Sequence, residues 1–209
     1  MQNIHNIIFD YGNVIFQIDF LRSKLAFQAL GIQDADSFFS HKQQHSLFDA
    51  LDMGKISEAE FYEGIREVSG LKGLSDAQIR DAWNALLIGV PKENHDILME
   101  MKSKYRTFLL SNNNEIHYRF VMDYLDKNFG LADNSGFFEK DYYSHLMGMR
   151  KPNRDIFEFV IEEHDLKPEE TLFIDDSPQH ILTAKELGIQ TVLLTQPDTL
   201  QALIKRLNL

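Results

Sequence analysis

The sequence predicts a doubly wound α/β protein, in which helices cover both faces of a Rossmann-like parallel sheet, with a small helical unit inserted after the first strand. Four short apolar runs indicate the sheet, because they lack the alternation of a half-exposed strand and suit strands that are buried on both faces. They span residues 4–9, 105–110, 171–174 and 191–194. Helical patterns lie between these runs, and strands that alternate with helices favour a doubly wound sheet.

The helix signals of the core lie between the later strands. Pro91 suits the first position of a helix, and the apolar residues at 97, 98 and 101 then share one helical face. Ser177 followed by Pro178 predicts an N-cap with proline at the first helical position, and Gly188 predicts the end of that helix.

The stretch between the first and second core strands has a different character. It contains no convincing buried strand, whereas Leu21, Leu25 and Ala29 recur at helical spacing and Ser57 opens a capping box with Glu60. We interpret this stretch as an inserted helical domain. The predicted division is a core of residues 1–16 and 90–209 and a helical insert of residues 17–89.

Composition narrows the function classes. The chain has 209 residues, a formal charge of -11 and no cysteine, which excludes disulfides, thiol catalysis and cysteine-bound zinc. The acidic balance argues against nucleic acid or an anionic membrane as the main partner. No basic stretch followed by an apolar run opens the chain, and no apolar segment approaches the roughly 20 residues that span a bilayer. We expect a cytoplasmic protein, a monomer or weak homodimer, that acts on a small molecule.

Polar side chains follow three of the predicted strands. Asp10 ends the first strand, Ser111 and Asn112 end the second, and the pair Asp175 and Asp176 ends the third. In such sheets ligands bind outside the carboxyl ends of the strands, so these groups are expected to meet at one edge. Each motif alone has an ordinary reading as a helix cap or loop residue, and the prediction depends on their combination.

The acidic groups predict a metal site. Asp10 and the adjacent pair Asp175 and Asp176 would repel one another, and a divalent cation resolves that repulsion. Magnesium takes one or two carboxylates together with carbonyl, water and phosphate oxygens. Asp10, the Gly12 carbonyl and Asp176 can supply the protein ligands, while Asp175 acts through water or orients the others.

The remaining motif residues suit an anionic substrate. Ser111 and Asn112 can cap the following helix, and they can also direct hydroxyl and backbone donors at phosphate oxygens. Lys151, before Pro152, is either a solvated lysine or the cation that offsets charge on the nucleophile and the transferring group.

The four motifs in this order resemble those of the haloacid dehalogenase superfamily of hydrolases with a helical cap. The segments DYGNV at 10–14 and GMRKP at 148–152 look closest to the α-D-glucose-1-phosphatase branch. The resemblance spans nearly the whole chain. It implies Asp10 as the nucleophile, Ser111 and Asn112 as phosphate binders, Lys151 as the charge clamp, and Asp176 as a metal ligand.

Position 12 departs from that pattern. Most phosphatases of the superfamily carry a second aspartate two residues after the nucleophile, which protonates the leaving group and then activates water. Gly12 offers only its carbonyl, so the source of that proton stays open, with Asp19 near the first cap hinge as one candidate. Dehalogenases also lack this acid, but they need no metal.

We therefore expect a magnesium-dependent phosphatase of small phosphorylated metabolites, sugar phosphates in particular, that works through an aspartyl-phosphate. A metal-independent 2-haloacid dehalogenase and a non-catalytic phosphometabolite-binding protein remain the alternatives. The cap would close over the site and select the substrate, with His45 and Phe48 as candidate contacts. Fold alone does not choose among these functions.

Overall fold

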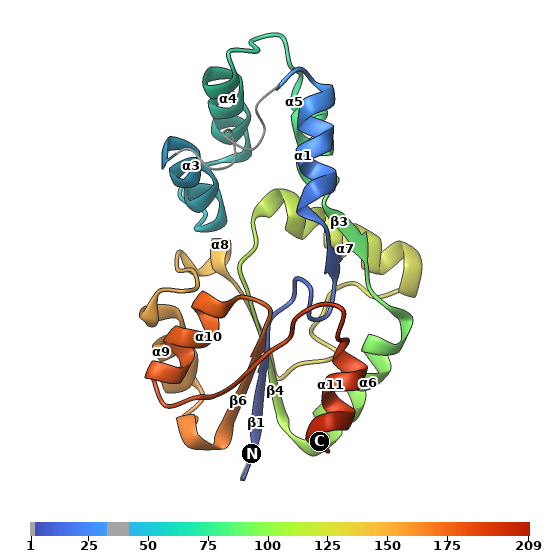
Figure 1. The fold of residues 1–209 in the computed structure, drawn as a ribbon, viewed down its shortest axis with the longest axis vertical. Coiled ribbons are helices and arrows are strands. Elements are labelled where there is room, and N and C mark those ends of the chain that lie inside the picture. Colours follow the sequence, from blue (N-terminus) through green and yellow to red (C-terminus); the bar gives the residue numbers. More distant parts are fainter. Residues whose placement is uncertain (1–2, 33–41) are drawn as a thin grey trace.

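The computed structural model describes residues 3–32 and 42–209, and the side chains of residues 42–45 lie outside that description. Its core is one sheet of five parallel strands in the order β5-β4-β1-β6-β7, with β1 at the centre (Figure 1). The strands are β1 (Asn6–Phe9), β4 (Arg106–Ser111), β5 (Lys140–Tyr143), β6 (Thr171–Asp175) and β7 (Gln190–Leu193).

Helices cover both faces of this sheet, as the sequence predicts. Ile7 and Phe9 of β1 point into an apolar cluster on one face, and Ile8 points into a separate cluster on the other. The first face carries α6 (Lys92–Lys104), α7 (Glu115–Phe129) and α11 (Leu200–Leu207). The second carries α9 (Arg154–Glu163) and α10 (Pro178–Glu186), seen on the opposite side of the strands in Figure 1.

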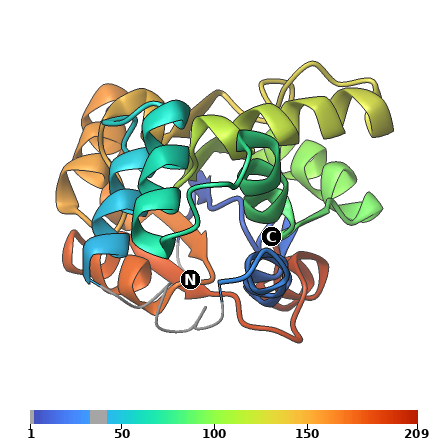
Figure 2. The same ribbon diagram turned by 90° about the horizontal axis from the view of Figure 1, so that it is seen from above.

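A helical unit stands beyond the carboxyl ends of the strands (Figures 1 and 2). Its helices pack around a cluster of their own that includes Phe61, Ile65, Ile79 and Trp83. They are α1 (Phe20–Ala29), α3 (Lys42–Asp52), α4 (Glu58–Ser69) and α5 (Asp76–Asn84). We call this unit the cap.

The two chain segments that join the cap to the core run side by side. β2 (Gln17–Ile18) pairs antiparallel with β3 (Leu87–Gly89), and the Asp19 amide donates to the Leu86 carbonyl oxygen at 2.9 Å. A short antiparallel pair of this kind ties both connections together at the point where the cap meets the sheet.

Several local signals hold in the structure. Ser57 forms the predicted capping box with Glu60 at the start of α4. Ser177 is the N-cap of α10, Pro178 is its first residue, and Gly188 follows the helix with a φ of +83°, where glycine avoids a steric cost.

Three expectations need correction. Pro91 is the N-cap of α6 and not its first helical residue, because its ψ of 132° is extended. In α1 the inward face holds Ser23 and Phe27, whereas Leu21 and Leu25 are more than half exposed. Finally, the sheet has an edge strand, β5, that the four apolar runs do not predict. Its sequence is not an apolar run, and only its last two residues, Tyr142 and Tyr143, are buried.

Two short elements complete the described chain, α8 (Ser144–Met147) and the 3-10 helix η1 (Pro168–Glu170). Among the described helices, none combines the length and apolar character that crossing a membrane requires.

Candidate active site

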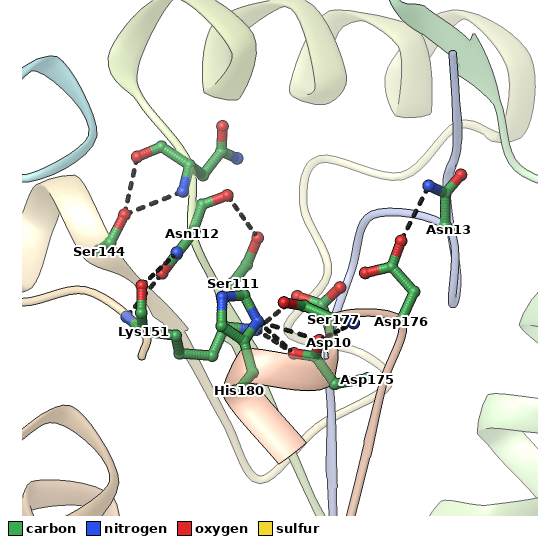
Figure 3. A network of polar contacts seen from close by, with 11 residues as sticks. Asp10, Asn13, Ser111, Asn112, Ser144, Lys151, Asp175, Asp176, Ser177 and His180 are labelled. Carbon is green, nitrogen blue, oxygen red and sulfur yellow. Dashed lines mark hydrogen bonds and ion pairs between the residues drawn. The ribbon is translucent and has the colours of Figure 1, made fainter. Parts of the chain in front are cut away.

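The predicted site residues meet at the carboxyl edge of the sheet. Asp10 directly follows β1 and its amide donates to the Ile174 carbonyl oxygen at 2.9 Å, which holds it beside the end of β6. Ser111 ends β4, and Asp175 ends β6. Figure 3 shows Asp10, Ser111, Lys151, Asp175 and Asp176 gathered at this edge.

Lys151 lies between two of these carboxylates. Its side chain is completely buried, with Nζ 2.6 Å from Asp10 Oδ1 and 2.7 Å from Asp175 Oδ2 (Figure 3). Burial by itself lowers the pKa of a lysine, but Asp10 and Asp175 outweigh it and raise the pKa of Lys151 above its ordinary value. The ammonium is therefore a fixed positive charge at the end of β1.

Asn112 holds Lys151 in that place through its side-chain amide. Its Nδ2 donates to the Lys151 carbonyl oxygen at 2.8 Å, and its Oδ1 accepts from the Lys151 amide at 2.9 Å. The side-chain amide predicted to bind phosphate is thus used to position the lysine. Ser111 is 3% exposed, and its hydroxyl has a long contact of 3.4 Å with the Asn112 carbonyl oxygen.

Three carboxylates form the acidic group that the sequence indicates for a metal. One oxygen from each of Asp10, Asp175 and Asp176 lies within 4.8 Å of the others. Burial raises the pKa of Asp10 to about 7 against the opposing effect of Lys151, and burial also raises the pKa of Asp176. A single lysine thus leaves the group with surplus negative charge, and carboxylate oxygens at this spacing fit a hard divalent cation.

Asp175, at the end of β6, and Asp176, directly after it, have different surroundings. Asp175 is saturated, because Oδ2 contacts Lys151 and Oδ1 accepts from the Ser177 amide at 2.7 Å and lies 3.0 Å from His180 Nδ1. Burial would raise its pKa, yet Lys151 and His180 lower the pKa of Asp175 to about 2. Among the described residues, Asp176 has one side-chain partner, because its Oδ2 accepts from Asn13 Nδ2 at 2.9 Å. Asp176 is therefore the better placed of the two to bind a metal directly.

Gly12 has little room for the second aspartate that the resemblance leads us to expect at this position. A Cβ at this position would lie 3.1 Å from Ile18 Cδ1, on the strand that leads to the cap. Asp19 does not fill the role in this structure, because its carboxylate accepts from the Leu21 amide at 2.9 Å as the N-cap of α1. Asp19 lines a separate groove beside β2 and β3, and it does not line the cavity described next.

A cavity of about 420 Å³ opens above the acidic group, between the sheet edge and the cap. Its lining includes apolar side chains, namely those of Phe16, Ile18, Phe20, Trp83, Leu86, Leu87 and Val121. It also includes polar and charged side chains, namely those of Asp52, Ser111, Asn112, Asn113, Asn114, His117, Arg150, Asp176, Ser177 and His180.

Of the two predicted cap contacts, Phe48 does not line the cavity. Phe48 packs its ring inside the cap, with centroids 5.5 Å from Phe61 and 4.8 Å from Trp83. His45 belongs to α3, but its side chain is outside the described residues.

Sequence reasoning missed several residues of this site. Asn13 holds Asp176 from a left-handed conformation with a φ of 55°, and asparagine is one of the few residues that adopts it readily. His180 contacts Asp175 from the first turn of α10. Asp52 and Arg150 come from the cap and the core, 98 positions apart in the numbering, with Arg150 Nη2 3.7 Å from Asp52 Oδ2. Of these residues, only Arg150 could have been predicted from the sequence, because it lies next to Lys151.

The family follows from comparison with known proteins. The sequence pattern of haloacid dehalogenase-like hydrolases matches residues 4–188, and this chain belongs to that family. The D-ribitol-5-phosphate phosphatase of Bacteroides thetaiotaomicron is 33% identical over 188 residues, which cover 90% of each chain.

Solved structures of similar proteins agree with this family assignment. A haloacid dehalogenase family enzyme from Bacteroides thetaiotaomicron, crystallised in complex with magnesium and inorganic phosphate, is 36% identical with a TM-score of 0.83, over 96% of this chain and 98% of that one. An L-2-haloacid dehalogenase from Xanthobacter autotrophicus is 20% identical with a TM-score of 0.61, over 98% of this chain and 82% of that one. The latter likeness shows a shared fold.

Proposed function

We propose that this hydrolase is a magnesium-dependent phosphatase that forms an aspartyl-phosphate on Asp10. The observation that carries the proposal is the arrangement around Lys151, whose buried ammonium contacts Asp10 and Asp175 while Asp176 completes an acidic group open to the cavity. One fixed cation beside several carboxylates suits the transfer of a phosphoryl group, since such catalysis depends on positioning and on offsetting charge.

Asp10, Asp176 and the Gly12 carbonyl would hold the magnesium ion, with Asp175 as a positioning residue for Lys151. When bound, the ion supplies positive charge to the phosphoryl oxygens. This assignment uses the oxygens left free by the described contacts, because both oxygens of Asp175 are engaged and Asp176 has one oxygen without a described partner.

The protein residues then divide the chemistry. Asp10 attacks phosphorus through a carboxylate oxygen, the bond from phosphorus to the leaving oxygen breaks, and water later releases orthophosphate from Asp10. Lys151 offsets charge on Asp10 and on the transferring group. Ser111, at the end of β4, contributes its hydroxyl to the phosphoryl oxygens, and Asn112 does so through its backbone, since its side chain holds Lys151.

The acidic group favours the phosphatase over the dehalogenase alternative. A metal-independent dehalogenase has no need for a third carboxylate next to Asp10 and Asp175, whose surplus charge would hinder attack on an anionic haloacid. The phosphatase name and the magnesium and phosphate complex among the relatives, at 33% and 36% identity, point the same way.

The cavity favours a neutral, polyhydroxylated leaving group. Its polar lining residues include amides, histidines and the pair Asp52 and Arg150, which suit hydroxyl groups, while its apolar lining residues suit a carbon chain or ring face. Sugar phosphates and polyol phosphates share these properties. A polyol phosphate such as D-ribitol 5-phosphate is the first substrate to test, because a relative named for it is 33% identical.

Phosphate release should require magnesium. In a hydrolysis screen of sugar, polyol and aryl phosphates, we expect turnover with magnesium and its loss with EDTA, because Asp10 and Asp176 would then share surplus negative charge without a cation. Restoring magnesium should restore the rate. Asp176→Ala should need far more magnesium for half-maximal activity than Glu186→Ala, a surface control on α10.

Halide release from a 2-haloacid in EDTA, without phosphatase activity, would establish the dehalogenase alternative. Binding of phosphometabolites without turnover, at any magnesium concentration, would establish the non-catalytic one.

A further inference from the structure

We propose that Asp52, at the end of the cap helix α3, supplies the proton that Gly12 cannot. In this role its carboxyl protonates the leaving oxygen and its carboxylate then takes a proton from the attacking water. The inference rests on the proposed phosphatase function. It assigns a catalytic task to a cap residue that the four motifs do not include.

Asp52 opens onto the same cavity as Asp10. Both residues line it, and about one fifth of the Asp52 side chain is exposed. Asp10 lies at the sheet edge, whereas Asp52 is the last residue of α3, a helix of the cap beyond that edge (Figure 1). A leaving group bound between them would have the nucleophile on one side and a carboxyl on the other, which is the placement a proton donor needs.

The core holds Asp52 in this position through three contacts. Its Oδ1 accepts from Asn114 Nδ2 at 3.1 Å, and its backbone carbonyl oxygen accepts from Ser144 Oγ at 2.6 Å. Arg150 Nη2 lies 3.7 Å from Oδ2. Asn114 and Ser144 belong to the segments that follow β4 and β5, so a cap carboxyl is fixed to the same edge of the sheet that carries Asp10.

The environment of Asp52 suits a group that holds and releases a proton. Burial raises its pKa to about 6, and the hydrogen bond from Asn114 and the charge of Arg150 offset this only in part. Its place as the last residue of α3 acts in the same direction, because a helix C-terminus disfavours a negative charge. A catalytic acid and base works best with a pKa near the operating pH.

The other carboxyls and the histidines that line the cavity have other contacts. His180 contacts Asp175, and Asp10 and Asp176 belong to the acidic group. His117 has both ring nitrogens near partners, Asn114 and the Trp83 carbonyl oxygen, and burial lowers its pKa to about 4. Among the described carboxyls that line the cavity, Asp52 is the one that does not belong to the acidic group.

Asp52 gives up one proton in the first step and takes one back in the second. In the first, the bond from Asp10 to phosphorus forms, the bond from phosphorus to the leaving oxygen breaks, and the Asp52 proton goes to that oxygen to give the free alcohol. In the second, water attacks phosphorus, its proton goes to Asp52, and the bond from Asp10 to phosphorus breaks to release orthophosphate. Asp52 ends each cycle protonated.

The test compares Asp52→Asn with Asp49→Asn on two substrates, D-ribitol 5-phosphate and 4-nitrophenyl phosphate. Asp49 lies one helical turn earlier and contacts Arg150 at 2.5 Å, but it does not line the cavity. In Asp52→Asn, kcat/KM for the alkyl phosphate should fall by about 10²–10⁴-fold, the usual contribution of a general acid. For the nitrophenyl phosphate it should stay within about tenfold, because that leaving group needs no proton.

Two further readouts separate catalysis from cap positioning. Asp52→Asn should release nitrophenol in a burst, since the second step lacks its base and phosphoenzyme accumulates. Asp49→Asn should change kcat/KM for both substrates by the same factor and show no burst. Equal losses on both substrates in Asp52→Asn, or no loss on the alkyl phosphate, would overturn the inference.

A measurement on the native enzyme covers the case in which Asp52→Asn does not fold. Across substituted phenyl phosphates, log kcat/KM should depend only weakly on the pKa of the leaving phenol, because a donated proton offsets its charge. A steep dependence would mean that no proton is donated and would refute the role of Asp52. No turnover of any phosphate by the native enzyme would instead refute the proposed function, and this inference with it.

Discussion

Asp10→Asn should abolish phosphate release while leaving the protein folded. The amide cannot attack phosphorus, and loss of the nucleophile in a covalent hydrolase costs on the order of 10⁶-fold in kcat. The fold should survive, because Lys151 keeps its contact with Asp175 at 2.7 Å when Asp10 loses its charge. Phosphate release under saturating substrate and magnesium, together with a thermal unfolding curve, checks both parts.

Asp123→Asn is the matched control, because Asp123 is an exposed aspartate of α7 that pairs with Lys127 on the surface. It should keep native activity. If Asp10→Asn retained more than about one tenth of the native rate, the nucleophile would have to be another group.

Lys151→Met should remove activity and weaken the fold together. The substitution leaves Asp10 and Asp175 as buried carboxylates without their cation, and breaking a buried ion pair in this way typically costs about 3–5 kcal/mol of unfolding free energy. The loss of its charge from the phosphoryl site should lower kcat by at least roughly 10²–10³-fold. Urea unfolding in EDTA gives the first quantity, and phosphate release with magnesium gives the second.

The destabilisation should grow with pH. Without Lys151, burial raises the pKa of both carboxyls, so the folded variant holds more protons than the unfolded chain and loses stability as pH rises. In the native protein the pKa of Asp175 is held at about 2, so its contribution is complete above the ordinary value of 3.8. The native protein also loses stability as Asp10 ionises, since the pKa of Asp10 is raised to about 7, but the variant loses stability at both carboxyls. The difference between native and variant should therefore be larger at pH 8 than at pH 5.

Lys104→Met separates this effect from a general loss of a lysine. Lys104 pairs with Glu100 on the exposed face of α6, and such surface pairs contribute less than about 1 kcal/mol. A Lys151→Met protein as stable as Lys104→Met at pH 8 would contradict the account of a buried, charge-balancing lysine.

The sequence predicts the core of the fold because its buried strands are short apolar runs that end in polar residues. Asp10, Ser111 and Asp175 could be placed together from that pattern alone, since parallel strands bring their carboxyl ends to one edge. The same reasoning failed at β5, where Lys140 and Asp141 interrupt any apolar run and only the pairing with β4 creates the strand.

Contacts between the cap and the core could not be predicted in this way. Asp52 meets Asn114 and Arg150 only because the hinge strands β2 and β3 set the cap above the sheet edge, and no spacing in the sequence reports that geometry. The apolar pattern of α1 predicted the wrong buried face for a related reason. Leu21 and Leu25 repeat at helical spacing, but packing against α5 selects the opposite face, with Phe27 inside.

The phosphoenzyme itself tests the central claim most directly. Native protein with magnesium and 4-nitrophenyl phosphate should be quenched in acid during turnover and digested, and the peptides examined by mass spectrometry. The account predicts one phosphoryl group on the peptide that contains Asp10, absent when EDTA is present and absent from Asp10→Asn. Steady release of orthophosphate with no phosphorylated peptide at any quench time, or with the phosphoryl group on another residue, would contradict it.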